Sequence, residues 1–316
     1  MDKFKPDGYA GIDVGKYELE IAVGEDKKTL TKANEIHQLS EWVKSLKGSY
    51  AVVLEATGSY HLLIAQLLYD AGHQVFVING YQLSQYRQSV GKRAKTDPED
   101  SLLLLRYLKR EYDQLRVWVP ASKNALKIRQ FLRRRAELVK LKGAICQSLS
   151  DVAEIDTKET ISSLVSTIKQ LEKLISSYLS LEGILDSAQR SQSVPGVGPL
   201  TSAALTTTYH CGTFSKSDAY IAFLGLDPVP KDSGKKTGRR RISKKGDSET
   251  RRLLHNAAMA ACKNDKHWKR FYESYVERGL SRTEALVIVA RKIARVTFGL
   301  LKSGQTYNPE LAFPTA

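Results

Sequence analysis

Two carboxylates in the first sixty residues lie where a strand would meet a ligand. Asp13 lies in the apolar run YAGIDV between Gly11 and Gly15, and Glu55 ends the apolar run AVVLE. A carboxylate within an apolar strand is costly unless a cation or hydrogen bonds compensate its charge. Because ligands gather at the carboxyl ends of strands in open α/β sheets, both side chains are candidates for one site.

Asp97 and Asp100 are the second half of this carboxylate set. They lie three residues apart in KTDPEDSLLLL, at the predicted start of a helix, so both can face one point. For this pair alone, capping of the helix N-terminus is the preferred explanation. A single strand aspartate is likewise more often satisfied by hydrogen bonds than catalytic. Together, the four carboxylates predict a site for one or two Mg²⁺ ions, with Mn²⁺ as the alternative, of the kind that promotes phosphoryl displacement.

A basic segment in the last third of the chain holds two candidate nucleophiles, Ser233 and Ser243. Residues 231–252 carry ten lysines and arginines against three acidic residues, an excess typical of a surface that binds nucleic acid phosphates. A serine attacks phosphorus only with help from a base or a metal, and here Asp232 or the carboxylate-bound metal would provide it. From the residues alone, a turn or cap role is preferred for both serines. The predicted nucleic-acid-binding side chains of this segment are Lys235, Lys236, Arg239, Arg240, Arg241, Lys244 and Lys245.

Two further stretches are candidates for phosphate contacts. VPGVGPLTSAAL is similar to a helix-hairpin-helix, in which the amides of Gly196 and Gly198 would contact DNA, and the alternative is a plain Pro-Gly turn. Arg133 and Arg134 belong to a basic cluster that could follow RNA or DNA. A solvated helix face explains that cluster equally well.

The pattern of apolar residues predicts an α/β domain followed by helices. Residues 8–30 read as an antiparallel hairpin with a possible third strand at KKTL, and alternating helices and strands follow up to residue 80, which predicts a mixed sheet. A hairpin followed by a βαβ unit is how the RNase H-like fold begins. Residues 121–190 predict two long helices, either an antiparallel coiled coil or an ordinary helix pair. The expected domains are therefore 1–120, 121–190 and a mainly helical 191–316.

Composition limits the class of protein. The chain has 316 residues, a formal net charge of +15 and three widely spaced cysteines, which favours a polyanionic partner and a reducing compartment. No apolar run approaches the length of a membrane span, and the first residues do not resemble a signal peptide. We expect a cytoplasmic, nucleoid-associated prokaryotic protein with no membrane partner.

The chain resembles the DEDD transposases of the insertion sequence 110 family, which are related to pilin-inversion recombinases. The resemblance is carried by the four carboxylates in their sequence contexts and by the segments VPGVGPLTSAAL, AYIAFLGLDP and DSGKKTGRRRISKKGDSETRRLLHNAA. The resemblance spans nearly the whole chain. It implies a RuvC-like DEDD nuclease domain, a helical coiled-coil linker and a C-terminal transposase domain. The implied activity is site-specific recombination of double-stranded DNA at the element ends and the target.

The same resemblance assigns roles and partners. It favours Ser233 over Ser243 as the nucleophile that forms a phosphoserine link with DNA. It implies a structured guide RNA encoded by the element, and a dimer or tetramer in which the serine meets carboxylates of another protomer.

Three alternatives stay open on the sequence. The first is a RuvC-type structure-specific endonuclease in which Ser233 only contacts DNA. The second is a catalytically inert nucleic-acid-binding protein. The third, a kinase-like ATPase built on the GIDVG hairpin, is least favoured because a convincing second Asp-Gly motif and a Walker A motif are both missing.

Overall fold

The computed structural model describes residues 5–24, 28–91, 97–152, 154–229 and 241–313. The chain forms two compact units, Met1–Pro120 and Ala121–Ala316, which we call the first and the second unit. Among the residues described, no helix is both long and apolar enough to cross a membrane. The further division at residue 190 stays a prediction.

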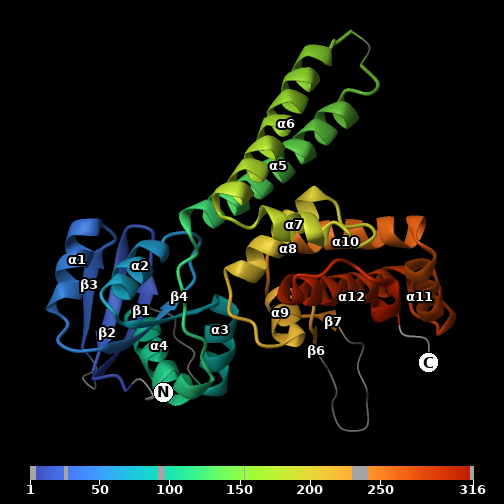
Figure 1. Ribbon diagram of the computed structural model, residues 1–316. Coiled ribbons are helices and arrows are strands. Elements are labelled where there is room, and N and C mark those ends of the chain that lie inside the picture. The colour runs from blue at the N-terminus through green and yellow to red at the C-terminus, as the bar shows by residue number, and fades with distance from the viewer. Residues whose placement is uncertain (1–4, 25–27, 92–96, 153, 230–240, 314–316) are drawn as a thin grey trace. The chain divides into compact units, whose positions relative to one another are not determined.

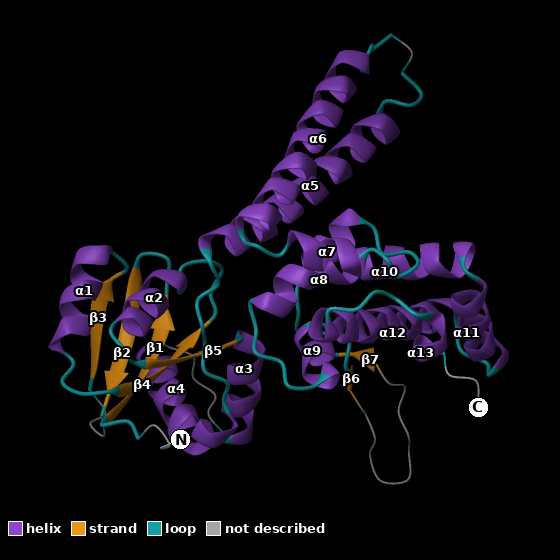
Figure 2. Cartoon of the chain, viewed as in Figure 1, coloured by secondary structure: helices purple, strands orange, loops and turns teal. Residues whose placement is uncertain are grey.

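The first unit is built on a five-stranded mixed sheet (Figures 1 and 2). Its strands are β1 (Gly8–Val14), β2 (Glu18–Val23), β3 (Thr29–Ala33), β4 (Tyr50–Glu55) and β5 (Gln74–Ile78), in the spatial order β3-β2-β1-β4-β5. Strand β2 is antiparallel to both β1 and β3, whereas β1, β4 and β5 are parallel. This order and these directions are those of the RNase H-like fold, so the predicted fold class is confirmed.

Helices cover both faces of this sheet because its central strands are apolar on both sides. Side chains Val52 and Leu54 of β4 pack with α1 (Ile36–Ser45) and α2 (Leu62–Asp70). Their alternating neighbours, Ala51 and Val53, pack on the other face with α3 (Gly80–Ser89) and α4 (Asp97–Glu111). The short 3-10 helix η1 (Tyr112–Gln114) follows α4. The face covered by α3 and α4 is the one that matters for the site.

The described part of the second unit is mainly helical, as predicted. A long hairpin of α5 (Lys123–Ser148) and α6 (Lys158–Leu181) comes first (Figure 1). The remaining elements are α7 (Leu185–Ser191), α8 (Pro199–His210), α9 (Ser217–Phe223), β6 (Pro228–Val229), β7 (Arg241–Ile242), α10 (Ser248–Asn264), α11 (Lys266–Glu277), α12 (Arg282–Ser303) and α13 (Pro309–Ala312).

Two apolar cores hold the second unit together. The larger one surrounds the fully buried Trp268 and Tyr220 and joins α8 to α12. The smaller one joins the base of the hairpin, through Ile128 of α5 and Ile175 of α6, to Ala203 of α8 and to α10. The two hairpin helices are antiparallel, because the start of α5 packs against the end of α6. The hairpin base therefore shares a core with the C-terminal helices.

Candidate active site

Asp13 and Glu55 lie at the same edge and on the same face of the sheet. The parallel register of β1 and β4 runs from Gly8 opposite Tyr50 to Ile12 opposite Leu54, so Asp13 and Glu55 are the next residues along. Since side chains alternate along a strand, both are on the face opposite to Ile12 and Leu54. That face is covered by α3 and α4, and both carboxylates are half-buried.

Gly11 allows α4 to approach this face closely. A Cβ atom at Gly11 would lie 2.4 Å from the backbone oxygen of Ser101 and 2.4 Å from the backbone nitrogen of Leu105. Any larger residue would push the helix off the strand, so the glycine is required for packing.

The direction of α4 brings its N-terminus to the edge that holds Asp13. Near the start of β1, the ring of Tyr9 meets Tyr112, just beyond the end of α4, with ring centres 6.0 Å apart. The helix therefore runs antiparallel to β1. Its first turn, with Asp97 at the start and Asp100 three residues later, points toward the carboxyl ends of β1 and β4. The side chain of Asp97 lies outside the described part of the structure.

Asp100 is buried and paired with an arginine that the sequence analysis did not single out. Its Oδ1 atom accepts a hydrogen bond from Nη2 of Arg87 on α3. The Asp100 side chain is 4% exposed and that of Arg87 is 14% exposed. A buried carboxylate needs such a partner, because an uncompensated charge in the interior is strongly unfavourable. Arg87 is 13 residues away in the chain and lies on a different helix, so no local pattern marks it.

Glu55 lies against the first turn of α3. A Cβ atom at Gly80, the first residue of α3, would be 2.5 Å from the Oε1 atom of Glu55. This turn is fixed by a capping box, in which Asn79 Oδ1 accepts from the Gln82 amide at 2.8 Å and the Asn79 amide donates to Gln82 Oε1 at 3.3 Å. The N-terminal end of a helix interacts favourably with negative charge, so the first turn of α3 is a suitable neighbour for the Glu55 carboxylate.

These carboxylates fit a divalent cation in chemistry but do not form a closed ligand set. Oxygen donors from Asp13, Glu55 and Asp100 are of the type that Mg²⁺ prefers. Among the side chains that the structure describes, no group of three or more metal-ligating residues is close enough to hold an ion, and one oxygen of Asp100 is engaged by Arg87. Asp97, or a phosphate oxygen of a substrate, would have to complete the coordination.

The first part of the basic segment, residues 231–240, lies outside the described residues, and Ser233 is in this part. The same is true of Lys235, Lys236, Arg239 and Arg240. The strands of the antiparallel pair β6 and β7, in which Val229 is opposite Arg241, flank residues 230–240 in the sequence. Three of the predicted phosphate-binding cations are described and exposed: Arg241 in β7, and Lys244 and Lys245 after it.

The other candidate nucleophile, Ser243, is part of a turn. Its hydroxyl donates to Oδ1 of Asp227, and its amide donates to the Asp227 carbonyl at 2.9 Å. Lys244 follows with a positive φ of 56°, and its amide donates to the carbonyl of Gly225 at 3.0 Å. These hydrogen bonds join residues that precede β6 to the residues that follow β7. Ser243 therefore has the turn role that is expected of a serine.

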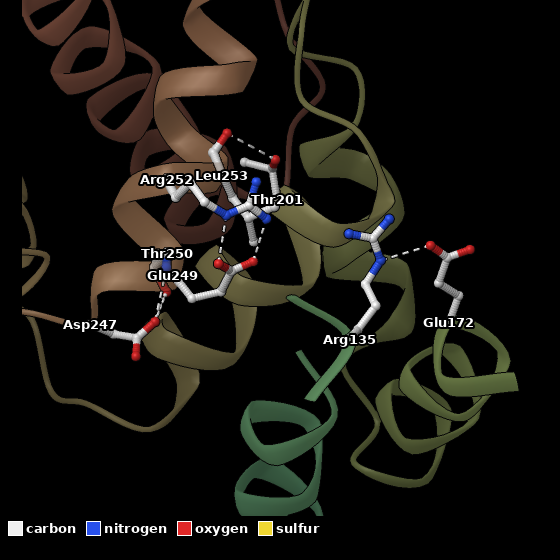
Figure 3. Close-up of polar contacts among 8 residues, drawn as sticks. All are labelled: Arg135, Glu172, Thr201, Asp247, Glu249, Thr250, Arg252 and Leu253. Atoms are coloured by element: carbon white, nitrogen blue, oxygen red, sulfur yellow. Dashed lines mark hydrogen bonds and ion pairs between the residues drawn. The ribbon is translucent and has the colours of Figure 1, made fainter. Parts of the chain in front are cut away.

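Arg133 and Arg134 have carboxylate partners. Arg133 Nη2 lies 2.9 Å from Asp247 Oδ1, and Arg134 Nη1 lies 2.7 Å from Glu137 Oε2. The other oxygen of Asp247 accepts from the amide and the hydroxyl of Thr250 in the first turn of α10 (Figure 3). Both arginine side chains are mostly exposed, at 62% and 64%, so these pairs leave guanidinium N–H groups facing water.

The two glycines of VPGVGPL have different surroundings. Gly196 has a φ of +84°, and a Cβ atom there would lie 2.2 Å from the carbonyl oxygen of Ala257 on α10. Packing against α10 thus explains Gly196. Gly198 is the exposed N-cap residue of α8, with nothing within 4 Å of a Cβ atom built on it. Their contact with DNA stays a prediction.

Comparison with models of known protein families identifies the family of this chain. The DEDD model of the IS110 group, described as Transposase, matches residues 10–153. The model described as Transposase IS116/IS110/IS902 family matches residues 188–273. The chain belongs to the IS110 family of transposases. It is accordingly an enzyme of the DNA transposase and recombinase class.

Individual relatives agree with this family. The pilin gene-inverting protein of Moraxella bovis is 24% identical over 319 residues, which cover 96% of this chain and 98% of the relative. The transposase for insertion sequence element IS1111A of Coxiella burnetii is 34% identical over 129 residues, covering 39% of this chain and 35% of the relative. A Thermus thermophilus RuvC structure matches 35% of this chain and 99% of its own, at 13% identity and a TM-score of 0.25.

The two IS110 family models divide the predicted site between them. The first model includes all four carboxylates, Asp13, Glu55, Asp97 and Asp100, and the second includes Ser233 and Ser243. Each half of the predicted site therefore falls in a segment that one of the two family models matches.

Proposed function

We propose that this transposase cuts and rejoins DNA with a magnesium site made by Asp13, Glu55, Asp97 and Asp100. The observation that carries the proposal is geometric. Asp13 and Glu55 end adjacent parallel strands on the face where the first turn of α4 arrives with the two aspartates. Rigid strands and a tightly packed helix are suited to holding a reactive phosphate in a defined position.

Magnesium bound by these carboxylates would stabilise the charge that develops on the phosphate and on the leaving oxygen. The chain's own residues hold the carboxylates in place. Gly11 allows α4 to lie on β1, the first turn of α3 packs against Glu55, and Arg87 neutralises Asp100 inside the fold.

Ser233 is the proposed nucleophile. Its Oγ atom attacks a phosphorus atom of DNA and gives up its proton to a base, while the bond from phosphorus to the sugar oxygen breaks and that oxygen leaves as a hydroxyl. The product is a phosphoserine link, and attack by the hydroxyl of another strand reverses the step and rejoins the DNA. The proposal is supported by the family model that spans Ser233 and by the engagement of Ser243 in a turn.

The positive charge of the chain supports the proposed partners. A net charge of +15 and the exposed cations Arg241, Lys244 and Lys245 in the described part of the basic segment suit the binding of DNA phosphates. We include in the proposal a structured guide RNA encoded by the element, and a homo-oligomer, dimer or tetramer, in which Ser233 meets the carboxylates of another protomer. The expected setting is the prokaryotic nucleoid.

Trapping of the covalent intermediate tests this proposal. Purified protein is mixed with magnesium and labelled DNA carrying the element ends, with element RNA added, and the adduct is resolved on a denaturing gel. We expect wild type and Ser243→Ala to form the adduct, and Ser233→Ala and Asp13→Asn to form none. Cleavage by Ser233→Ala without an adduct would support instead a RuvC-type endonuclease that uses water. Full activity of Asp13→Asn would refute the carboxylate site.

A further inference from the structure

Three exposed tyrosines follow strands that end at the edge of the sheet that holds the carboxylates. Tyr17 lies in the turn after β1, Tyr60 in the loop after β4, and Tyr81 is the second residue of α3, directly after β5. Their exposed fractions are 76%, 40% and 62%. Because β1, β4 and β5 are parallel, their carboxyl ends share one edge of the sheet, and the three tyrosines follow the strand ends at the edge that also holds Asp13 and Glu55. We call Tyr17, Tyr60 and Tyr81 the tyrosine edge.

The backbone that carries these rings is held by specific hydrogen bonds. The Nδ2 atom of Asn34 donates to the carbonyl of Gly15 at 3.1 Å and to that of Tyr60 at 3.2 Å. The Asn34 amide also donates to the carbonyl of Tyr17 at 2.8 Å. One asparagine thus ties together the turn after β1 and the loop after β4, and the capping box of α3 orders the turn that precedes Tyr81.

The ammonium group of Lys16 lies over the ring of Tyr17. Lys16 Nζ is 4.8 Å from the centre of the Tyr17 ring. A positive charge next to an exposed aromatic face is a combination suited to a nucleotide, because the amine can meet a phosphate while the ring stacks on a base. The same combination is of little use to a purely apolar partner.

From this arrangement we propose that the tyrosine edge stacks on unpaired bases next to the phosphate that the carboxylates act on. In a paired duplex both faces of each base are covered by its neighbours, so a ring can stack only where the duplex is opened or kinked. The substrate class is therefore DNA that is locally unpaired at the cleavage point. This inference rests on the proposed function, because the carboxylates must act on DNA for the edge to serve them.

Binding measured without cleavage tests the inference separately from the chemistry. The full chain is titrated, with Ca²⁺ in place of Mg²⁺, into two labelled duplexes of the same sequence context. One is fully paired, and the other has a central mismatched bubble that carries a fluorescent base analogue. We expect Tyr17→Ala and Tyr81→Ala each to weaken binding to the bubble by about fivefold or more. Binding to the paired duplex should not change, and quenching of the base analogue should be lost.

Two controls keep the result interpretable. Tyr17→Trp should retain the bubble preference, because the larger ring also stacks. Tyr69→Ala should behave as wild type, because Tyr69 is 38% exposed but lies near the end of α2 that leads into β5, at the opposite edge of the sheet.

Wild-type affinity of Tyr17→Ala and Tyr81→Ala for the bubble would overturn the inference, and so would an equal loss on both duplexes. If the tyrosine edge binds another protein instead of DNA, Tyr17→Ala and Tyr81→Ala should bind the bubble with wild-type affinity. Failure of the proposed function would show differently, as DNA cleavage that survives in Asp13→Asn.

Discussion

Two aspartates beside helix N-termini, one in each unit, have opposite surroundings. Asp247 precedes α10 at the surface with 35% of its side chain exposed, and its partner Arg133 is 62% exposed. Its Oδ2 atom accepts from the Thr250 amide at 2.9 Å, which makes it an N-cap. Asp100 lies within the first turn of α4, nearly fully buried, and is paired with the buried Arg87 of another helix.

This comparison separates a structural aspartate from a candidate catalytic one. A cap needs only an oxygen near the amide two or three residues ahead, and it can remain at the surface while it does so. The cap through Oδ2 and the exposed ion pair of Oδ1 with Arg133 therefore account for the two oxygens of Asp247. Capping does not require a carboxylate to be buried against an arginine, so the position of Asp100 needs another reason, and the proposed metal site provides one. The following predictions test this difference, from the largest expected effect to the smallest.

The largest effect is expected for Asp100→Asn. Loss of a metal-binding carboxylate should lower magnesium-dependent DNA cleavage by at least about a hundredfold, since charge stabilisation at the phosphate is lost. The matched change Asp247→Asn should leave cleavage near the wild-type rate, because asparagine is also a good N-cap. Rates from single-turnover cleavage of a labelled substrate check this, and equal rates for both variants would remove the distinction.

Arg87→Ala should destabilise the first unit strongly. The change leaves the buried Asp100 carboxylate without a counter-charge, which costs about 3–5 kcal/mol of unfolding free energy. Because a cation at the proposed site would compensate that charge, added Mg²⁺ should raise the melting temperature of this variant more than that of wild type. Arg87→Lys should show a smaller loss. Identical Mg²⁺ responses in all three proteins would argue against a metal beside Asp100.

A smaller effect is expected for Asp247→Ala, about 1 kcal/mol, from the lost cap. Burial alone would raise the pKa of Asp247, but hydrogen bonds from Thr250 and Arg133 outweigh it, so the pKa lies below the usual value. A lowered pKa contributes stability that is present above about pH 4 and is lost as the pH falls through the folded-state pKa. The difference between wild type and Asp247→Ala in urea unfolding should therefore narrow in strong acid.

The smallest effect is expected for Arg133→Ala. Its ion pair with Asp247 is exposed and screened by water, so the free energy of unfolding should change by about 0–1 kcal/mol. Denaturant titrations at low and high salt check this. A clear drop in DNA affinity with a smaller salt dependence would show that Arg133 leaves Asp247 to bind phosphate.

Much of the fold of the first unit could be predicted because its strands and helices are encoded by short stretches of sequence. Alternating apolar residues in short runs produce the strands, and the hairpin-first order of elements leads to the observed sheet. Asp13 and Glu55 could be selected because each is a charged residue at the end of an apolar strand. The two-residue strands β6 and β7 could not be predicted, since two residues carry no periodicity.

The hydrogen-bond and ion-pair partners of the predicted residues could not be found from the sequence pattern. Arg87 and Asp100 are 13 residues apart on different helices, and Ser243 and Asp227 are 16 residues apart across the β6–β7 segment. Arg133 and Asp247 are separated by 114 residues. Such pairs depend on how helices pack, and a side-chain pattern along the chain does not encode them.

The sequence by itself determined the class of fold, the charge of the surface and the residue types available for phosphate chemistry, because each depends on composition or on short-range periodicity. Tertiary structure alone decided which aspartate is buried and which is a cap, since burial depends on contacts between distant elements. It also decided that the tyrosines after three separate strands share one edge with Asp13 and Glu55. Parallel pairing of those strands is the physical reason, because it aligns their carboxyl ends.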